Sequence, residues 1–87
     1  MKLRVTTSIS QDLFLVRVEG ALAGDEVDEL GRMCRSLAGS TNLDLSGVRW
    51  ADDRGLRMIR TLVDEGAKPV KVPPFLTLLL DSDAARE

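Results

Sequence analysis

The chain has 87 residues, a length that fits one small domain and leaves no room for a second hydrophobic core. Apolar residues make up 44% of the chain and charged residues 30%, a balance typical of a globular protein rather than a disordered one. The net charge of −2 and the aromatic content of 3% argue against the basic patch and the base-stacking platform of a nucleic-acid-binding protein.

The residue types also restrict the chemistry and the compartment. Histidine, the commonest general base and transition-metal ligand, is absent from the sequence. The single cysteine, Cys34, forms no internal disulfide, which agrees with a reducing compartment, and its place on an apolar stripe predicts a buried small hydrophobe. The apolar run at residues 73–80 is far shorter than the roughly 20 residues of a membrane span. We therefore expect a cytoplasmic protein that does not insert into a membrane.

The first two elements are predicted to be strands. Residues 2–8 alternate apolar and polar side chains and are rich in β-branched residues, which predicts an edge strand. Residues 10–12, Ser-Gln-Asp, predict a turn. Residues 13–19 read LFLVRVE and are apolar on both faces, as in a more central strand. The two strands are expected to pair as an antiparallel hairpin, and Gly20 is expected to end the second.

A helix is expected next, after a loop of small residues at 21–24. Asp25 can cap this helix, which should run to about Leu37. One apolar stripe at helical spacing is expected to face the core: Val27, Leu30, Met33, Cys34 and Leu37. Residues 38–41 should end the helix, with Gly39 directly after its C-cap.

The next strand and helix meet at a polar turn. Residues 42–48 alternate and predict a third strand, which Gly47 should bend or end. Asp52 is a good N-cap for a second helix, and Gly66 is expected to close that helix. Its buried stripe is predicted as Leu56, Ile59, Leu62 and Val63, and its water-facing side as Arg57, Arg60 and Asp64.

The last part of the chain completes an α/β domain. Residues 69–72 predict a short fourth strand, stopped by two prolines, and residues 75–80 predict a short helix that covers an end of the sheet. Residues 81–87 are polar and expected to fray. The resulting order is β-β-α-β-α-β-α. Right-handed crossovers then give a four-stranded mixed sheet with helices packed on it, in a single domain over residues 1–87.

One stretch resembles a known signature. Residues 43–59, LDLSGVRWADDRGLRMI, resemble the motif of STAS domains, the family of anti-sigma factor antagonists. The family pattern is a strand ending near Asp-Leu-Ser, an aromatic residue, then Asp-Ser-Ser/Thr-Gly-Leu opening a helix. Residues 18–30, VEGALAGDEVDEL, match the strand, glycine, loop and helix that precede it. The resemblance covers nearly the whole chain, which is shorter than most members, and implies a STAS fold and a non-enzymatic protein–protein interaction module.

The sequence departs from that pattern at the regulated position. Asp52 matches the motif aspartate and Gly55 the motif glycine. In regulated members the residue after the motif aspartate is a serine, which is phosphorylated by a partner kinase that is also the anti-sigma factor. Asp53 stands there, and Arg54 replaces the second hydroxyl residue, so the resemblance predicts that no phosphorylation switch is present. Asp53 either imitates the phosphorylated state with a weaker negative charge or only caps the helix.

The resemblance also implies a docking surface, built from the turn at 52–55 and the loop before the first helix: Asp52, Asp53, Arg54, Gly55, Gly24 and Asp25. One expected partner is an anti-sigma factor of the serine-kinase type. A second hypothesis makes the chain a subunit of a larger assembly, such as a lipid-transport ABC system, with transporter subunits as partners. No cofactor is expected in either case.

A third hypothesis groups Asp44, Asp52 and Asp53 into an acidic Mg²⁺ pocket of a phospho-acceptor domain. We rank it last because the chain is short for that fold and shows no lysine and hydroxyl pair after the later strands. No nucleophile–base pair is evident, so we expect no catalytic residues, no metal ligands and no enzyme.

Trp50 and Arg54 each allow two interpretations. A tryptophan before an exposed turn is either a core residue at the strand end, which we favour, or an interface anchor. An arginine at the start of a helix either pairs with a partner's anion or stays solvated.

Overall fold

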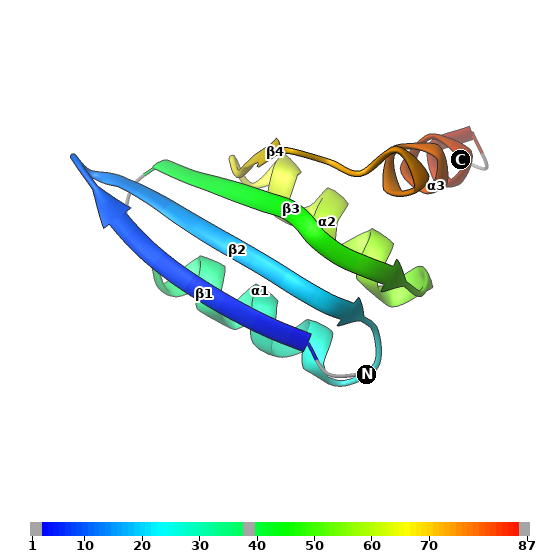
Figure 1. Cartoon of the computed structure of the whole chain (residues 1–87), viewed down its shortest axis with the longest axis horizontal. Coiled ribbons are helices and arrows are strands. Elements are labelled where there is room, and N and C mark those ends of the chain that lie inside the picture. Colours follow the sequence, from blue (N-terminus) through cyan, green and yellow to red (C-terminus); the bar gives the residue numbers. More distant parts are fainter. Residues whose placement is uncertain (1–2, 38–39, 86–87) are drawn as a thin grey trace.

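The computed structural model describes residues 3–37 and 40–85, which fold into one sheet with three helices in the predicted order (Figure 1). The strands are β1 (Leu3–Ser10), β2 (Leu13–Leu22), β3 (Ser40–Ala51) and β4 (Lys68–Val70). The helices are α1 (Glu26–Ser36), α2 (Asp53–Asp64) and α3 (Pro74–Ala85). The sheet has the order β1-β2-β3-β4, with β1 antiparallel to β2 and the other pairs parallel. The predicted four-stranded mixed sheet is confirmed.

Two helices cover one face of the sheet. Figure 1 shows α1 and α2 against the same face, while α3 lies on the β3–β4 side. The core lies between these layers. Inward-facing residues of β2 and β3 (Val16, Val18, Leu22, Leu43 and Leu45) pack against residues of the three helices (Val27, Leu30, Leu56, Ile59, Leu62 and Leu76). On the opposite face of the sheet, which we call the open face, strand alternation places polar residues such as Arg17 and Asp44.

The first hairpin closes through a two-residue turn. Gln11 and Asp12 both have positive φ angles, 49° and 68°, and Ser10 pairs with Leu13 across the turn. Positive φ at both central residues suits the right-handed twist of the two strands. The antiparallel hairpin is confirmed, and Ser10, predicted as part of the turn, belongs to β1.

Two glycines that were expected to end strands lie inside them. β2 continues past Gly20 to Leu22, and β3 continues past Gly47 to Ala51. Between β2 and β3 the register shifts after Arg17 and again after Gly20, with the additional residue on β3 each time. These bulges place the additional β3 residues without ending the strand pairing, so both strands are longer than predicted.

The stripe of α1 is confirmed in part. Val27, Leu30 and Cys34 are buried, and burial raises the pKa of the Cys34 thiol. Met33, by contrast, is 36% exposed, and its sulfur lies 3.4 Å from the Thr7 hydroxyl at the β1 edge of the sheet. Leu37 is half-buried just after the helix. The prediction for Gly39 concerns a residue outside the described part of the chain.

The end of α2 follows the prediction. Gly66 has φ 110°, and its N–H donates to the Val63 carbonyl at 3.0 Å. The Ala67 N–H donates to the Leu62 carbonyl at 2.9 Å. This is the Schellman pattern, which satisfies the last free carbonyls of a helix when the residue after its C-cap adopts positive φ. Val63 was predicted to be buried but is 37% exposed, because the core contacts of this turn come from Leu62.

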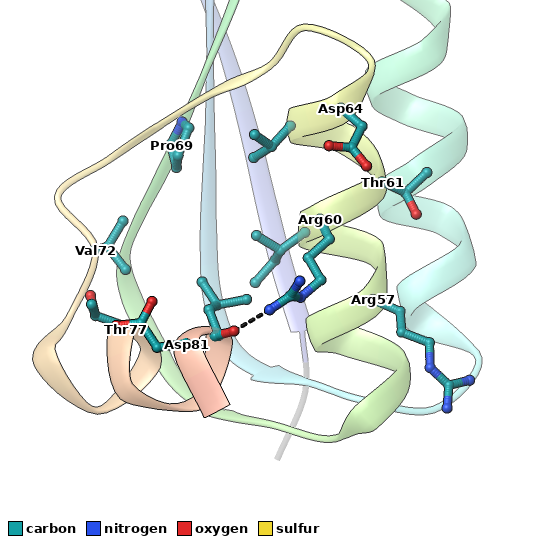
Figure 2. A pocket seen from close by; sticks show the side chains of 11 residues that line it. Arg57, Arg60, Thr61, Asp64, Pro69, Val72, Thr77 and Asp81 are labelled. Carbon is teal, nitrogen blue, oxygen red and sulfur yellow. Dashed lines mark hydrogen bonds between the residues drawn. The ribbon is translucent and has the colours of Figure 1, made fainter. Parts of the chain in front are cut away.

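The C-terminal segment differs most from the prediction. α3 continues to Ala85, where residues 81–87 were expected to fray, and residues 86–87 lie outside the described chain. Leu76 is buried in the core. Arg60, expected to face water, donates a hydrogen bond to the Leu80 carbonyl and so joins α2 to α3 (Figure 2). None of the described helices is long and apolar enough to cross a membrane.

Candidate partner-binding site

Asp52 is the N-cap of α2, as predicted. Its backbone is extended (φ −89°, ψ −177°), and its Oδ1 accepts a hydrogen bond from the Gly55 N–H at 2.8 Å. Its Oδ2 accepts from the Gly24 N–H at 3.1 Å, in the loop before α1. One carboxylate therefore starts the helix and holds the neighbouring loop against it. The two segments that the resemblance placed in one docking surface are brought together by this side chain.

Gly55 is buried because the first turn of α2 lies directly against the end of β2. A Cβ atom on Gly55 would lie 2.1 Å from the carbonyl oxygen of Leu22, a backbone atom that has no rotamer to change. The same carbonyl accepts a hydrogen bond from the Asp52 N–H at 3.2 Å. The position therefore requires glycine for close approach of two backbones.

Arg54 pairs within the molecule, an arrangement that neither sequence interpretation contained. Its guanidinium lies 3.4 Å from Asp25 Oδ1 and 3.2 Å from Asp28 Oδ2. Asp25 does not cap α1: its backbone is helical (φ −67°, ψ −23°) and its side chain makes no capping hydrogen bond. Such exposed pairs contribute only about 0–1 kcal/mol each to stability. Their effect is to orient Arg54 across the starts of both helices.

Asp53 is the first residue of α2 and is exposed to solvent. Within residues 3–37 and 40–85, no cationic side chain forms an ion pair with its carboxylate. It lies at the positive end of the helix dipole, where a negative charge is favoured by about 0.3–1 kcal/mol. Both aspartates thus stand at the beginning of the helix, with Asp52 half-buried as the cap and Asp53 turned to water.

Trp50 is 55% exposed, so the favoured interpretation as a core residue was wrong. The bulges in β3 shift its alternation, and Val48 and Ala51 are the residues that point into the core. A tryptophan with this exposure, two residues before the capping aspartate, adds an apolar side chain beside the acidic turn. Its position directly before the polar turn was the sequence signal for this role.

Asp44 lies apart from the turn. Its side chain is 2% exposed on the open face, with Oδ1 2.9 Å from the Ser46 N–H and Oδ2 3.5 Å from Arg17 Nε. Burial raises its pKa, but hydrogen bonds from the Ser46 N–H and hydroxyl, together with the charges of Arg17 and Lys71, have the larger combined effect, and the net pKa is lowered. Among the described residues, no group of three potential ligands could hold a metal ion.

This environment predicts a pH-dependent contribution to stability. Because the folded pKa of Asp44 lies below the unfolded value of about 3.9, the ionised carboxylate stabilises the fold above that pH. The advantage of wild type over Asp44→Asn should be about 1.5–3 kcal/mol near neutral pH, the size of a hydrogen bond to a charged group. It should disappear as the pH falls through the folded pKa. Urea unfolding at a series of pH values measures it. A difference between wild type and Asp44→Asn that stays constant across this pH series would contradict the assignment.

A cleft of about 640 Å³ lies between α2, the segment after β4, and α3 (Figure 2). Arg60, Thr61 and Thr77 contribute polar groups to its wall, beside apolar residues such as Val72. None of the six predicted site residues lines this cleft. Apart from buried Gly55, the predicted docking residues instead lie at an outer surface at the starts of α1 and α2.

No family model matches the sequence, and no curated protein matches it. Solved structures are similar in fold, among them two anti-sigma factor antagonists. One is an anti-sigma-factor antagonist, a STAS domain from Rhodobacter sphaeroides, with 24% identity and a TM-score of 0.60 over 77% of this chain and 82% of that chain. The other is the anti-sigma factor antagonist SpoIIAA in its unphosphorylated form, with 11% identity and a TM-score of 0.65 over 92% of this chain and 82% of that chain. The chain has a STAS-like fold, as the resemblance at residues 43–59 predicted.

Proposed function

We propose that this chain is a non-enzymatic protein–protein interaction module of the anti-sigma antagonist type. It docks through Asp52, Asp53 and Arg54 together with Gly24 and Asp25, on a turn that buried Gly55 holds in place, and it lacks the serine phosphorylation switch. The observation that carries the proposal is the exposed carboxylate of Asp53 at the first residue of a capped helix, on a STAS-like fold.

The geometry around Asp53 supports docking because the surface is already ordered. Asp52 holds the Gly24 loop, Gly55 packs on the β2 backbone, and Arg54 spans the two helix starts. A surface ordered before binding loses less conformational entropy when a partner arrives. Its carboxylates and arginine offer charge and hydrogen bonds, and exposed Trp50 adds an apolar contact of the kind enriched at interface centres.

The charge at Asp53 takes the place of a regulated group. A phosphoserine carries about −1.5 to −2 charges and three acceptor oxygens, whereas Asp53 carries one charge and two oxygens. It is therefore a permanent and weaker imitation of the phosphorylated state. Control of such a module then comes from its abundance or from its partner, with no covalent modification of this residue.

The replacement Asp53→Ser tests the proposal. The variant should fold like wild type and bind a kinase-type anti-sigma factor about tenfold more tightly, since it removes the imitation charge (about 1.4 kcal/mol). With ATP it should become phosphorylated, and wild type should take up no phosphate. Calorimetric titration and phosphate incorporation measure the two effects. Asp64→Ser makes the same chemical change at the other end of α2 and should alter neither.

An unchanged affinity for Asp53→Ser would reduce Asp53 to a charge that favours the helix start. Affinity purification from the native cell identifies the partner class. An anti-sigma factor captured by wild type, and captured more strongly by Asp53→Ser, supports the antagonist function. Transporter subunits captured with the same dependence support the assembly-subunit hypothesis.

A further inference from the structure

The two edges of the sheet are built differently. β4 has three residues, includes Pro69, and is followed by Lys71 with φ 52°, so that edge offers little backbone for pairing. β1 has eight residues in an unbroken register with β2, and Arg4 is its one charged residue. Short strands, prolines and lysines are the devices that protect sheet edges from pairing with another chain. The β4 edge has them and the β1 edge lacks them.

The hairpin register shows which backbone groups of β1 face outward. In a two-residue hairpin the closing pair, here Ser10 with Leu13, exchanges hydrogen bonds, and the bonded positions then alternate along the strand. Val5, Thr7 and Ile9 therefore direct their N–H and C=O groups away from β2. The Leu3 N–H, in the same phase, donates to Glu26 Oε2 at 3.2 Å, which agrees with this assignment.

The side chains of this edge also leave apolar surface uncovered. Ile9 is 68% exposed, on the helix-covered face of the sheet and next to the hairpin turn. Thr7 lies on the same face, where its hydroxyl contacts the half-exposed Met33. A strand added at this edge would cover Ile9 and would satisfy the outward backbone groups at the same time.

We propose that a second copy of this chain pairs with the β1 edge, antiparallel and about a two-fold axis at Thr7. Val5 then lies opposite Ile9 of the partner subunit, and Thr7 lies opposite Thr7 of the partner subunit. Arg4 lies opposite Ser10 of the partner subunit. Each outward-facing pair exchanges two hydrogen bonds. No like charges face each other, and the β-branched pair of Val5 and Ile9 is a favourable cross-strand contact.

The axis at Thr7 follows from two restrictions. First, a two-fold axis that sets the two sheets in one continuous sheet, with both open faces on the same side, pairs odd-numbered residues with odd-numbered ones and even with even. Second, the residues that exchange hydrogen bonds must be Val5, Thr7 and Ile9, whose backbone groups face outward. An axis at Thr6 would also satisfy the phase, but it brings the partner's strand over Leu3, whose N–H is already bound to Glu26. An axis at Ser8 also satisfies the phase, but it sets Val5 opposite Gln11 of the partner subunit, which lies in the hairpin turn, and so loses the pair of Val5 with Ile9. The axis at Thr7 leaves the Leu3 bond intact and keeps all three outward-facing residues paired. The dimer contains no residue of the turn at 52–55, so its test is independent of the proposed function.

Sedimentation equilibrium of the full chain over a range of concentrations tests the dimer. Wild type should approach about twice 9.5 kDa at high concentration and dissociate on dilution, because edge pairing buries a small interface. Ile9→Lys should raise the dissociation constant at least about tenfold. Leu78→Lys is the matched control: Leu78 is also 68% exposed, but on α3, and its replacement should leave the dimer unchanged.

Two further measurements locate the interface. Thr7→Pro removes an outward N–H that β2 does not use, so the monomer should fold and the dimer should be lost. Amide hydrogen exchange at Val5, Thr7 and Ile9 should slow with rising concentration in wild type and in Leu78→Lys. A wild type that stays monomeric at millimolar concentration would overturn the proposal. A dimer that survives Ile9→Lys, or one that forms without protection of these amides, would overturn it as well.

Discussion

Replacing Gly55 by alanine is expected to destabilise the protein by about 1–3 kcal/mol, near the upper end of that range. The added methyl group would lie 2.1 Å from the Leu22 carbonyl oxygen, so the start of α2 must move away from the end of β2. That movement stretches the bond from the Asp52 N–H to the same oxygen. Urea unfolding measures the loss, and we expect weaker partner binding because the docking turn shifts with the helix.

Gly31→Ala is the matched control for this prediction. Gly31 is also a buried helical glycine, but an added Cβ there meets the ends of two flexible side chains, Met58 at 2.9 Å and Arg35 at 3.4 Å. Met58 can change rotamer, and alanine gains up to about 1 kcal/mol of helix propensity over glycine. Its stability should therefore stay within about 1 kcal/mol of wild type. Equal losses for the two variants would show that the Leu22 contact does not determine the residue at position 55.

Replacing Asp52 by alanine is expected to cost about 1–2 kcal/mol, the usual value for loss of an N-cap side chain. It removes the acceptor for the Gly55 N–H and also the acceptor for the Gly24 N–H. Besides lower stability in urea unfolding, we expect faster hydrogen exchange at the Gly24 amide. The loop before α1 would then be held only by weaker contacts such as the exposed pair of Arg54 with Asp25.

Asp52→Asn separates the two functions of this side chain. Asparagine keeps one acceptor oxygen, which can still cap α2 at Gly55, but it presents its amide group to the Gly24 N–H. We expect a smaller loss of stability than in Asp52→Ala, together with the same faster exchange at Gly24. Slow exchange at Gly24 in both variants would show that the loop is held without Asp52.

These contacts give the proposed function a physical basis. The proposed docking surface consists of short polar segments whose positions depend on a buried glycine and a half-buried aspartate. Asp53 can vary without strain because its side chain points to water, whereas Asp52 and Gly55 cannot. A substitution that changes the charge at position 53 should therefore leave the shape of the surface unchanged.

The sequence by itself determined the order of the elements, the mixed sheet, the cap at Asp52 and the glycine end of α2 at Gly66. The elements, the cap and the helix end depend on neighbours within a few positions: the spacing of apolar residues, a side chain reaching the first free N–H groups, or a residue that tolerates positive φ. The mixed sheet then follows from the order of the elements, because strand–helix–strand units favour parallel pairing. The STAS-like motif at residues 43–59 was visible for the same reason, since its strand, turn and helix start are contiguous.

Only the tertiary structure decided where β2 and β3 end, how Trp50 is exposed and what Arg54 binds. The bulges that carry the strands past Gly20 and Gly47 arise between two paired strands, and they also turn Trp50 away from the core. Arg54 meets carboxylates that precede it by more than twenty positions, at Asp25 and Asp28. Such features depend on contacts between segments distant in the chain, and local residue patterns do not encode them.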